Sequence, residues 1–375
     1  MSWNVQRQNY GYTVDGIFHH SKINALQAAA GDISRLKLYF HDDDWSHVDW
    51  TIEPSESWQS LVDRKCHQLR DKYQTLTLFF SGGYDSITIL NAFIRNNLKI
   101  EELVIWERPW LLHLKSEVNY ALELAKKIKQ HYWPNVKITH MVRQADHVDD
   151  FYRQHKENWI HQVGNHVAIN KQTMRNWEFE KNSVIAGGSQ SSTHGFIEGR
   201  DKPRLDFVDG KWYATMNDDL LKWCMDSSSE QFYFDPEMPE LYVKQCYMMV
   251  DWLERSYDVT HELVHQIQSH MDPLAYEQWN LAVGRDKVFD KSARYGIGAK
   301  KADMSGVKSI DNIILGDHLE KNHKGAYLIW KNGIEEIKHT WSAAWDSNRN
   351  DLKTVISKQH FLRDYRPKEK SLSTI

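Results

Sequence analysis

The stretch LTLFFSGGYDS, residues 76–86, decides the fold of this chain. A short apolar run at 76–80 ends in Ser-Gly-Gly, and apolar residues then recur at helical spacing between residues 87 and 94. A buried strand, a glycine turn and the start of a helix are the structure that this order predicts. We call residues 81–86 the glycine loop.

The glycine loop has the residue types of an anion site. Gly82 and Gly83 let the backbone curl so that successive N–H groups point into one concavity, and the next helix aims its N-terminus at the same place. Ser81 and Ser86 add two hydroxyl groups. The pattern predicts a ligand with several anionic oxygens, such as pyrophosphate. No Lys-Ser/Thr closes the loop, so it is not the G-x-x-x-x-G-K-S/T nucleotide loop. The alternative is a glycine turn that only joins a strand to a helix.

Strands and helices alternate on the C-terminal side of this loop. Further short strands are predicted at 103–106, 136–142 and 183–186, with a helix over 118–128. This alternation predicts an α/β fold in which helices cover both faces of a parallel sheet. Ligands of such sheets bind at the carboxyl ends of the strands, where the glycine loop and a second turn, Gly187-Gly188, are both expected.

The flanking segments predict smaller units. The first 55 or so residues predict a β-rich cap, with one hairpin over 10–18 and a second over 36–52 that turns at three aspartates. Later segments predict a hairpin at 205–214, mostly helix over 236–290 and a hairpin at 326–337. We therefore expect three parts: a cap at 1–56, a nucleotide-binding domain at 57–255 and a helical and hairpin extension at 256–375.

The glycine loop resembles the S-G-G-x-D-S signature of the PP-loop ATP pyrophosphatases. Within this family, residues 57–255 look most like the synthetase domain of asparagine synthetases and β-lactam synthetases. A helix at 57–72 and the segment 232–237, similar to that branch's P-F-L-D element, carry the likeness. The resemblance implies an adenine nucleotide alpha hydrolase-like fold and an ATP-dependent ligase that forms AMP and pyrophosphate.

The resemblance also implies roles for individual residues. It assigns the ATP pyrophosphate to Ser81, Gly82, Gly83, Asp85 and Ser86, with Asp85 near Mg²⁺. It places adenine at Ile105 and Trp106, and the α-phosphate at Gly187 and Gly188. Asp85, Ser86 and Lys300 are the candidate catalytic residues, the last in a basic, glycine-bearing segment at 291–301 that is a candidate lid or a solvated loop. An Asp85→Ala variant is expected to abolish AMP formation with the fold intact.

Two departures from the asparagine and β-lactam synthetase branch narrow the range of substrates and nitrogen sources that we expect. Ser191-Ser192 stand where the branch usually has an acidic pair, which argues against aspartate as the substrate. Residue 2 is Ser2, not the nucleophilic cysteine of glutamine-using members, so glutaminase activity is not expected. The nitrogen would come from ammonia, from an amine substrate or from an ammonia-supplying partner.

Three alternatives remain open at the level of the sequence. One is a nucleobase- or tRNA-modifying ligase of the same family, although no strongly basic appendage indicates nucleic acid. Another is a nucleotide-binding protein without catalysis. The third is a zinc hydrolase, because His261, Glu262 and His265 match H-E-x-x-H. With 20 histidines in the chain, such pairs also arise by accident.

Charge, hydropathy and cysteine content argue against several other classes of protein. The 375 residues carry 47 basic and 51 acidic side chains, a formal charge of −4, so there is no global attraction to nucleic acid or anionic lipid. No apolar run approaches a membrane span, and mean hydropathy is −0.66. Without a secretory signal, and with three widely spaced cysteines, the chain is expected in the reducing cytoplasm. The oligomeric state is left open.

Overall fold

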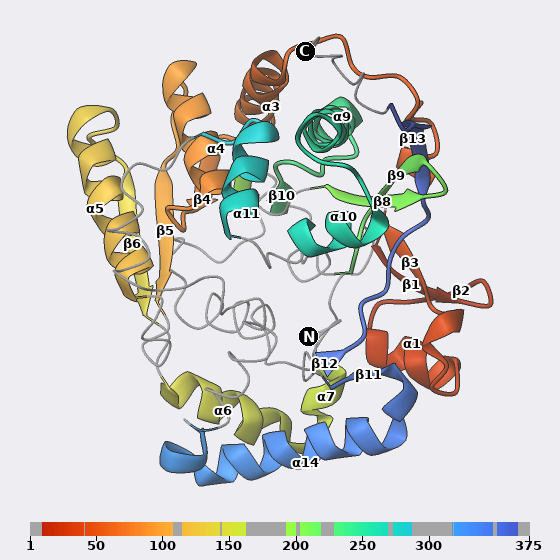
Figure 1. The fold of residues 1–375 in the computed structure, drawn as a ribbon. Helices are drawn as coiled ribbons and strands as arrows, with labels where there is room; N and C mark the ends of the chain where they lie inside the picture. Colours follow the sequence, from red (N-terminus) through yellow and green to blue (C-terminus); the bar gives the residue numbers. More distant parts are fainter. Residues whose placement is uncertain are drawn as a thin grey trace.

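A five-stranded parallel sheet forms the centre of the described chain (Figure 1). The computed structural model describes residues 10–40, 42–107, 115–142, 145–162, 193–199, 203–218, 229–268, 273–286, 317, 319–347 and 351–366. The strand order is β10-β7-β4-β5-β6, with every neighbouring pair parallel. These strands are β4 (Thr75–Phe79), β5 (Glu102–Glu107), β6 (Lys137–Val142), β7 (His194–Glu198) and β10 (Ser229–Gln231). The predicted α/β class with a parallel sheet is confirmed.

Helices flank this sheet. The central strand β4 buries Leu76, Thr77 and Leu78 in succession, as a strand covered on both faces does. Helix α3 (Trp58–Lys72) packs on α4 (Tyr84–Arg95), and α5 (Lys115–His131) packs on β5 and β6. Each helix lies where the apolar spacing predicts one. Together they place the glycine loop between a buried strand and a 12-residue helix.

The strand beside β4 is one that the sequence pattern does not predict. The segment predicted as the fourth strand, 183–186, lies outside the described residues. The place next to β4 is occupied by β7, whose Ile197 pairs with Leu78. The segment His-Gly-Phe-Ile-Glu does not read clearly as a strand, because a histidine and a glycine interrupt its apolar pattern. Gly195 is needed there, since a Cβ would meet the Tyr73 ring at 2.4 Å.

The N-terminal cap contains one predicted hairpin and not the second. Strands β1 (Tyr10–Val14) and β2 (Ile17–His19) pair through a turn with positive φ at Asp15 and Gly16, and β3 (Lys37–Phe40) joins the other side of β1. A short helix α1 (Lys22–Ala28) and a 3₁₀ turn (Ile33–Arg35) connect β2 with β3.

The predicted hairpin over 36–52 is wrong. The three aspartates begin a short helix, α2 (Asp42–Trp45), because acidic side chains stabilise a helix N-terminus. Trp45 and Trp50 then pack against each other in the core, with ring centroids 5.5 Å apart.

A second antiparallel sheet combines distant parts of the chain. Strands β8 (Arg204–Val208) and β9 (Lys211–Thr215) form the predicted hairpin, and β13 (His360–Asp364) pairs with the free side of β9. The predicted helical region contains α9 (Pro239–Ser256), α10 (His261–Gln268) and α11 (Pro273–Ala282). Strands β11 (Trp345–Asp346) and β12 (Asp351–Leu352) form a small ladder, and a 3₁₀ turn (Ser342–Ala344) precedes it.

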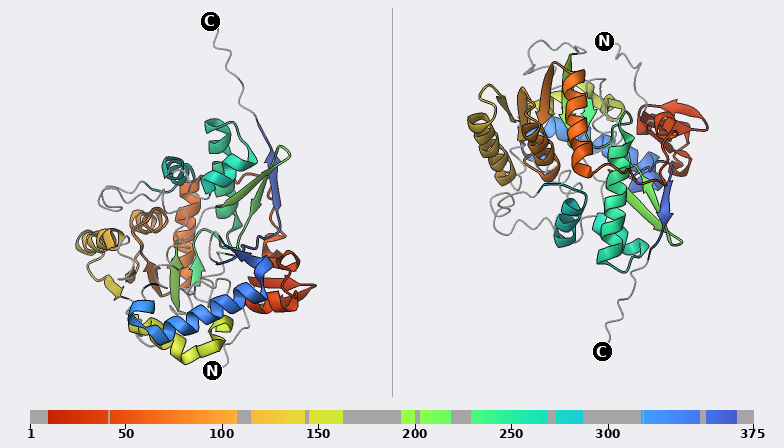
Figure 2. Two further views of the ribbon diagram at one scale, coloured as in Figure 1. Left: turned by 60° about the horizontal axis from the view of Figure 1, so that its bottom comes forward. Right: turned by 90° about the horizontal axis from the view of Figure 1, so that it is seen from above.

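The hairpin predicted at 326–337 is also wrong. These residues form helix α14 (Lys324–Thr340), which packs on α6 (Ala145–His155) (Figure 2). Buried Ala326, Trp330, Ile334 and Ile337 recur at intervals of three or four, which is helical spacing. Gly333 marks a close approach rather than a turn, because a Cβ there would lie 2.5 Å from the Trp159 indole nitrogen. That tryptophan begins α7 (Trp159–Gln162), after a 3₁₀ turn (Lys156–Asn158).

A buried ion pair joins the cap with later parts of the chain. Lys22 Nζ lies 2.6 Å from Asp218 Oδ2, and both side chains are fully buried. Tyr12 donates to the same carboxylate, and Lys22 also donates to the Lys353 carbonyl. The three-part division therefore stays a prediction, with strong contacts across its proposed boundaries.

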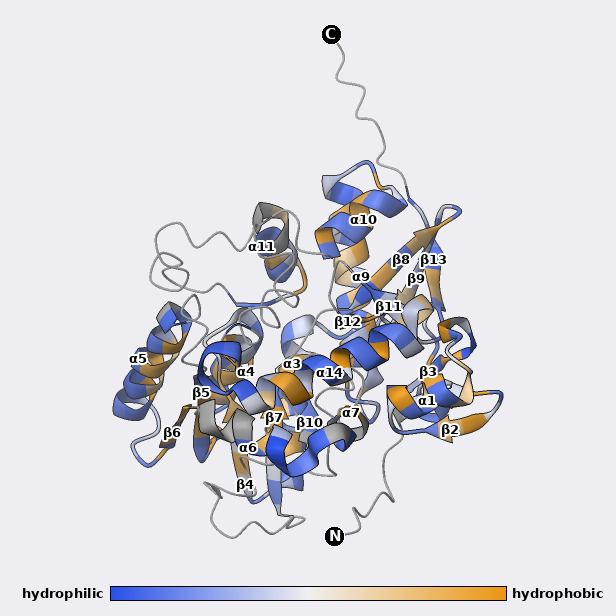
Figure 3. Ribbon diagram, turned by 90° about the horizontal axis from the view of Figure 1, so that it is seen from below, coloured by the Kyte–Doolittle hydropathy of each residue, from blue (hydrophilic) through white to orange (hydrophobic). Residues whose placement is uncertain are grey.

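Figure 3 shows hydrophobic residues along the central strands and mixed faces on helices such as α5 and α14. Among the described residues, no helix is long and apolar enough to cross a membrane.

Candidate functional site

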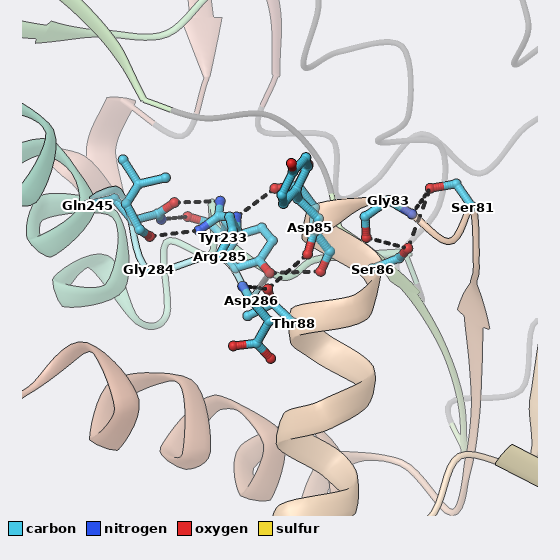
Figure 4. Close-up of polar contacts among 12 residues, drawn as sticks. Ser81, Gly83, Asp85, Ser86, Thr88, Tyr233, Gln245, Gly284, Arg285 and Asp286 are labelled. Carbon is cyan, nitrogen blue, oxygen red and sulfur yellow. Dashed lines mark hydrogen bonds and ion pairs between the residues drawn. The ribbon is translucent and has the colours of Figure 1, made fainter. Parts of the chain in front are cut away.

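The glycine loop connects the end of β4 with the start of α4. Gly82 has φ +70°, the left-handed region that favours glycine, and Gly83 is the extended N-cap of the helix. The Gly83 N–H donates to Ser81 Oγ over 3.2 Å, and Ser86 Oγ donates to the Gly83 carbonyl over 3.2 Å (Figure 4). The two serine oxygens are 3.4 Å apart. These contacts hold the loop in one shape before any ligand is considered.

Helix α5 supports the loop from behind. A Cβ on Gly82 would lie 3.1 Å from Tyr120 and 3.2 Å from Ala121, so the loop backbone lies directly against α5. The first-turn N–H groups of α4 have no acceptor within the helix and bear the positive end of its dipole. The anion site at this loop stays a prediction.

Asp85 lies in the first turn of α4, where its carboxylate forms an ion pair with Arg285. Arg285 Nε donates to Asp85 Oδ1 over 2.6 Å. The arginine side chain is fully buried, and the Asp85 side chain is 19% exposed. The sequence analysis missed Arg285. Its position three residues after the end of α11, and 200 positions from Asp85, offers no local signal.

Several elements hold the Arg285 guanidinium. Its carbon lies 3.6 Å from the centre of the Tyr233 ring, and Nη2 donates to Gln245 Oε1 of α9 over 2.8 Å. Tyr233 in turn donates its hydroxyl to the Asp85 carbonyl over 2.9 Å. Figure 4 shows this set of contacts on one side of α4. Burial raises the pKa of Tyr233 above its ordinary value, so the hydroxyl remains a donor at neutral pH.

The segment that carries Arg285 is fastened on both sides. Trp58 Nε1 donates to the Gly284 carbonyl over 2.8 Å, and the Asp286 N–H donates to Thr88 Oγ1 over 2.8 Å. Gly284 has φ +77°, and a Cβ there would lie 2.3 Å from the Trp58 ring. The arginine therefore reaches Asp85 from a backbone that is fixed against α3 and α4.

The neighbouring strand ends add three residues that the sequence alone does not single out. Gly199 follows β7, and a Cβ there would lie 3.1 Å from the Asp85 carbonyl carbon. Glu198 ends β7 with only 1% exposure, and Gln231 ends β10 directly opposite it. The carboxyl ends of β4, β7 and β10 thus meet at the glycine loop, where a ligand of a parallel sheet binds.

The two residues expected near adenine differ in accessibility. Ile105 is buried in the core with 1% exposure, whereas Trp106 is partly exposed. The residues of β5 before Trp106 are all buried, so exposure begins at the carboxyl end of the strand. Next to them, His140 Nε2 lies 2.7 Å from Glu107 Oε2.

Other predicted residues fall outside the described part of the chain. They are Gly187, Gly188, Ser191, Ser192 and Lys300, together with the basic segment at 291–301. Their roles stay predictions.

Asp85 is the acidic residue of the glycine loop that suits a magnesium ion. Among the described residues, no group of three or more His, Cys, Asp or Glu side chains is placed to hold a metal. Mg²⁺ commonly binds through one or two carboxylates together with substrate phosphates. The loop therefore fits an ion that arrives with a polyphosphate, and not a dedicated protein cage.

The H-E-x-x-H sequence lies on α10. His261, Glu262 and His265 are all exposed there.

Burial raises the pKa of the Cys66 thiol and of the Cys246 thiol, as expected of inert core cysteines.

The segment 232–237 is part of the core. Phe232, Tyr233 and Phe234 are buried, and Asp235 forms a buried ion pair with Lys65 of α3. This segment positions Tyr233 under Arg285.

No family model and no curated protein sequence matches the chain. Its fold is similar to the NH3-dependent NAD synthetase from Campylobacter jejuni subsp. jejuni NCTC 11168, solved in complex with the nitrate ion. The TM-score is 0.30 at 15% sequence identity, and the match covers 67% of this chain and 97% of the synthetase chain. A likeness of this size adds nothing about function.

Proposed function

We propose that this chain is an ATP-dependent ligase that forms AMP and pyrophosphate. It would adenylate a carbonyl or carboxylate substrate, which ammonia or an amine then attacks. The observation that carries this proposal is the corner at residues 79–86, where Gly82 turns with φ +70° into the N-terminus of a 12-residue helix. Such a corner concentrates N–H donors and positive dipole at one point, which is what a pyrophosphate needs. Its S-G-G-x-D-S sequence adds the resemblance to the PP-loop ATP pyrophosphatases.

In this proposal the glycine loop binds and orients the nucleotide. The backbone at Gly82 and Gly83 and the hydroxyls of Ser81 and Ser86 hold the pyrophosphate. Trp106, partly exposed at the end of β5, is the better placed of the two residues expected near adenine. Gly187 and Gly188 keep their proposed places near the α-phosphate, and Lys300 keeps its proposed place in a lid over the polyphosphate.

The reaction has two steps. A substrate oxygen attacks the α-phosphorus and pyrophosphate leaves; the amine then attacks the activated carbonyl carbon and AMP leaves. The chain's part in the first step is to stabilise charge that develops on the leaving pyrophosphate, through N–H groups already in place. Mg²⁺, when bound with ATP, supplies further positive charge at these oxygens.

A second candidate is a nucleotide-binding protein without catalysis. One observation favours it: Oδ1 of Asp85, the acidic residue of the glycine loop, is already bound to Arg285. The two candidates differ in turnover and agree on ATP binding.

Labelled ATP distinguishes the two. The purified protein is incubated with ATP labelled at the α-phosphate, Mg²⁺, an ammonium salt and a small-molecule extract, and the products are separated. AMP with pyrophosphate is expected. ADP would contradict the ligase, and tight ATP binding without turnover would favour the second candidate.

A further inference from the structure

The buried Arg285 places a fixed positive charge against the Asp85 carboxylate, at the edge of the glycine loop. We propose that Arg285 is a positioning residue that compensates and orients the Asp85 carboxylate, and so sets how strongly nucleotide binding depends on Mg²⁺. This inference rests on the proposed function, since it takes ATP to bind at the glycine loop.

The charge of Arg285 is buried. The Arg285 side chain is fully buried, and a buried guanidinium is costly unless a carboxylate compensates it. Asp85 is that carboxylate, and it is 19% exposed. Without the guanidinium, the negative charge of Asp85 would lose this compensation in the first turn of α4, beside an incoming polyphosphate.

The orientation of the Arg285 guanidinium is fixed by its contacts. The pair to Asp85 is made by Nε, while Nη2 is bound to Gln245 on α9, so the planar group is held at two separate points. The Tyr233 ring covers its face at 3.6 Å. A lysine would keep the charge but lacks a second donor nitrogen in a fixed plane.

Loss of the Arg285 charge should affect metal-free ATP and Mg²⁺ in opposite directions. Asp85 without the Arg285 charge repels metal-free ATP more strongly than in the wild type, and it attracts Mg²⁺ more strongly. Loss of the Arg285 charge should therefore weaken binding of metal-free ATP much more than binding of MgATP.

The test measures ATP affinity by calorimetry, once with excess Mg²⁺ and once with excess EDTA. The dissociation constant in EDTA is divided by the dissociation constant in Mg²⁺, and this ratio is compared between the wild type and Arg285→Gln. We expect the ratio to be about tenfold larger in Arg285→Gln, since a unit charge a few ångströms from the ligand has an effect of that order near a protein surface. Arg285→Lys, which keeps the charge without the fork, should change it about threefold.

A second background shows whether Arg285 acts through Asp85. In Asp85→Asn, adding Arg285→Gln should raise the ratio less than it does in the wild-type background, because the Asp85 carboxylate that attracts Mg²⁺ is absent. An equal rise in both backgrounds would mean that Arg285 acts on the nucleotide directly, which would overturn the inference.

The matched control is Arg363→Gln. Arg363 is another well-buried arginine, 11% exposed, paired with Asp251 and Glu254 away from the glycine loop. Its replacement should lower the melting temperature and leave the ratio unchanged.

The remaining outcomes separate this inference from the proposed function. A folded Arg285→Gln with an unchanged ratio would make Arg285 a structural tie only, and would overturn the inference while ATP binding stands. If Arg285→Gln does not fold, Arg285→Lys decides in the same way. A wild-type protein that binds no ATP would overturn both.

Discussion

Arg285 Nε donates to Asp85 Oδ1 over 2.6 Å, which joins the segment after α11 to the first turn of α4. This contact changes the choice of test for the glycine loop. Asp85→Ala would leave a fully buried guanidinium without its carboxylate. A loss of activity in that variant would then mix chemistry with stability.

Asp85→Asn is the cleaner substitution. It keeps an oxygen that accepts from Arg285 and removes the negative charge. We expect it to lower AMP formation about 100-fold or more, which is the scale for removing one preorganised electrostatic group. Labelled ATP measures this, and urea unfolding should show that Asp85→Ala loses roughly 3–5 kcal/mol, more than Asp85→Asn. Asp63→Asn, in another aspartate–arginine pair, should keep its activity. Full activity of Asp85→Asn would remove the glycine loop as the site.

Gly82→Ala and Gly210→Ala form a matched pair. Both glycines have φ near +70°, so a side chain costs about 1–2 kcal/mol at either position. A Cβ on Gly210 meets nothing within 4 Å, whereas one on Gly82 meets Tyr120 and Ala121 at 3.1–3.2 Å. Calorimetry should show loss of ATP affinity in Gly82→Ala only, with a larger loss of stability in denaturant. Equal ATP affinity in both variants would contradict a role for Gly82.

Lys22→Met tests the tie between the cap and the rest of the chain. The substitution leaves the fully buried Asp218 carboxylate without its lysine, so we expect a loss of about 3–5 kcal/mol in the free energy of unfolding. Lys126→Met is the control, because its pair with Glu123 is about two-thirds exposed and a surface pair contributes little to stability. Similar small losses in both would mean that the buried pair does not stabilise the fold.

His360 predicts an acid limit to stability. Its ring stacks on Trp50 at 4.1 Å, and burial, helped by Lys358, lowers its pKa to about 4. The unfolded chain binds a proton near pH 6.5 and the folded chain does not. Stability should therefore fall as pH drops from 6.5 to about 4, and be unaffected by His360 above that window.

His360→Phe keeps a ring against Trp50 and removes the proton site. Unfolding measured across this pH range should show a weaker pH dependence than in the wild type. His261→Gln, at an exposed histidine, should behave as the wild type does. An unchanged pH dependence in His360→Phe would contradict the assignment.

The parts of the structure that the sequence predicted are local. The glycine loop, the hairpins at Asp15-Gly16 and Asp209-Gly210, and helices α3 to α5 each depend on a few consecutive residues with strong preferences. A glycine next to an aspartate at positive φ is such a signal, and both hairpins have it.

The parts that were missed depend on partners far away in the chain. The dipeptide Asn332-Gly333 favours a hairpin turn, yet Gly333 makes room for Trp159 from another helix. Strand β7 pairs along β4 despite a weak pattern, because Gly195 admits the Tyr73 ring. Arg285 is one of 47 basic residues, and only the folded chain brings it to Asp85.

Strand β13 has a consequence for how the protein is made. Residues 360–364 complete a sheet whose other strands lie at 204–215, and Tyr247 donates to the Leu362 carbonyl at its centre. During synthesis, the hairpin and α9 emerge well before the strand that covers them. Contacts this distant in sequence form late and slowly. The growing chain therefore exposes an unpaired strand edge at β9 until residues 360–364 have been translated, and that edge is where premature self-association would begin.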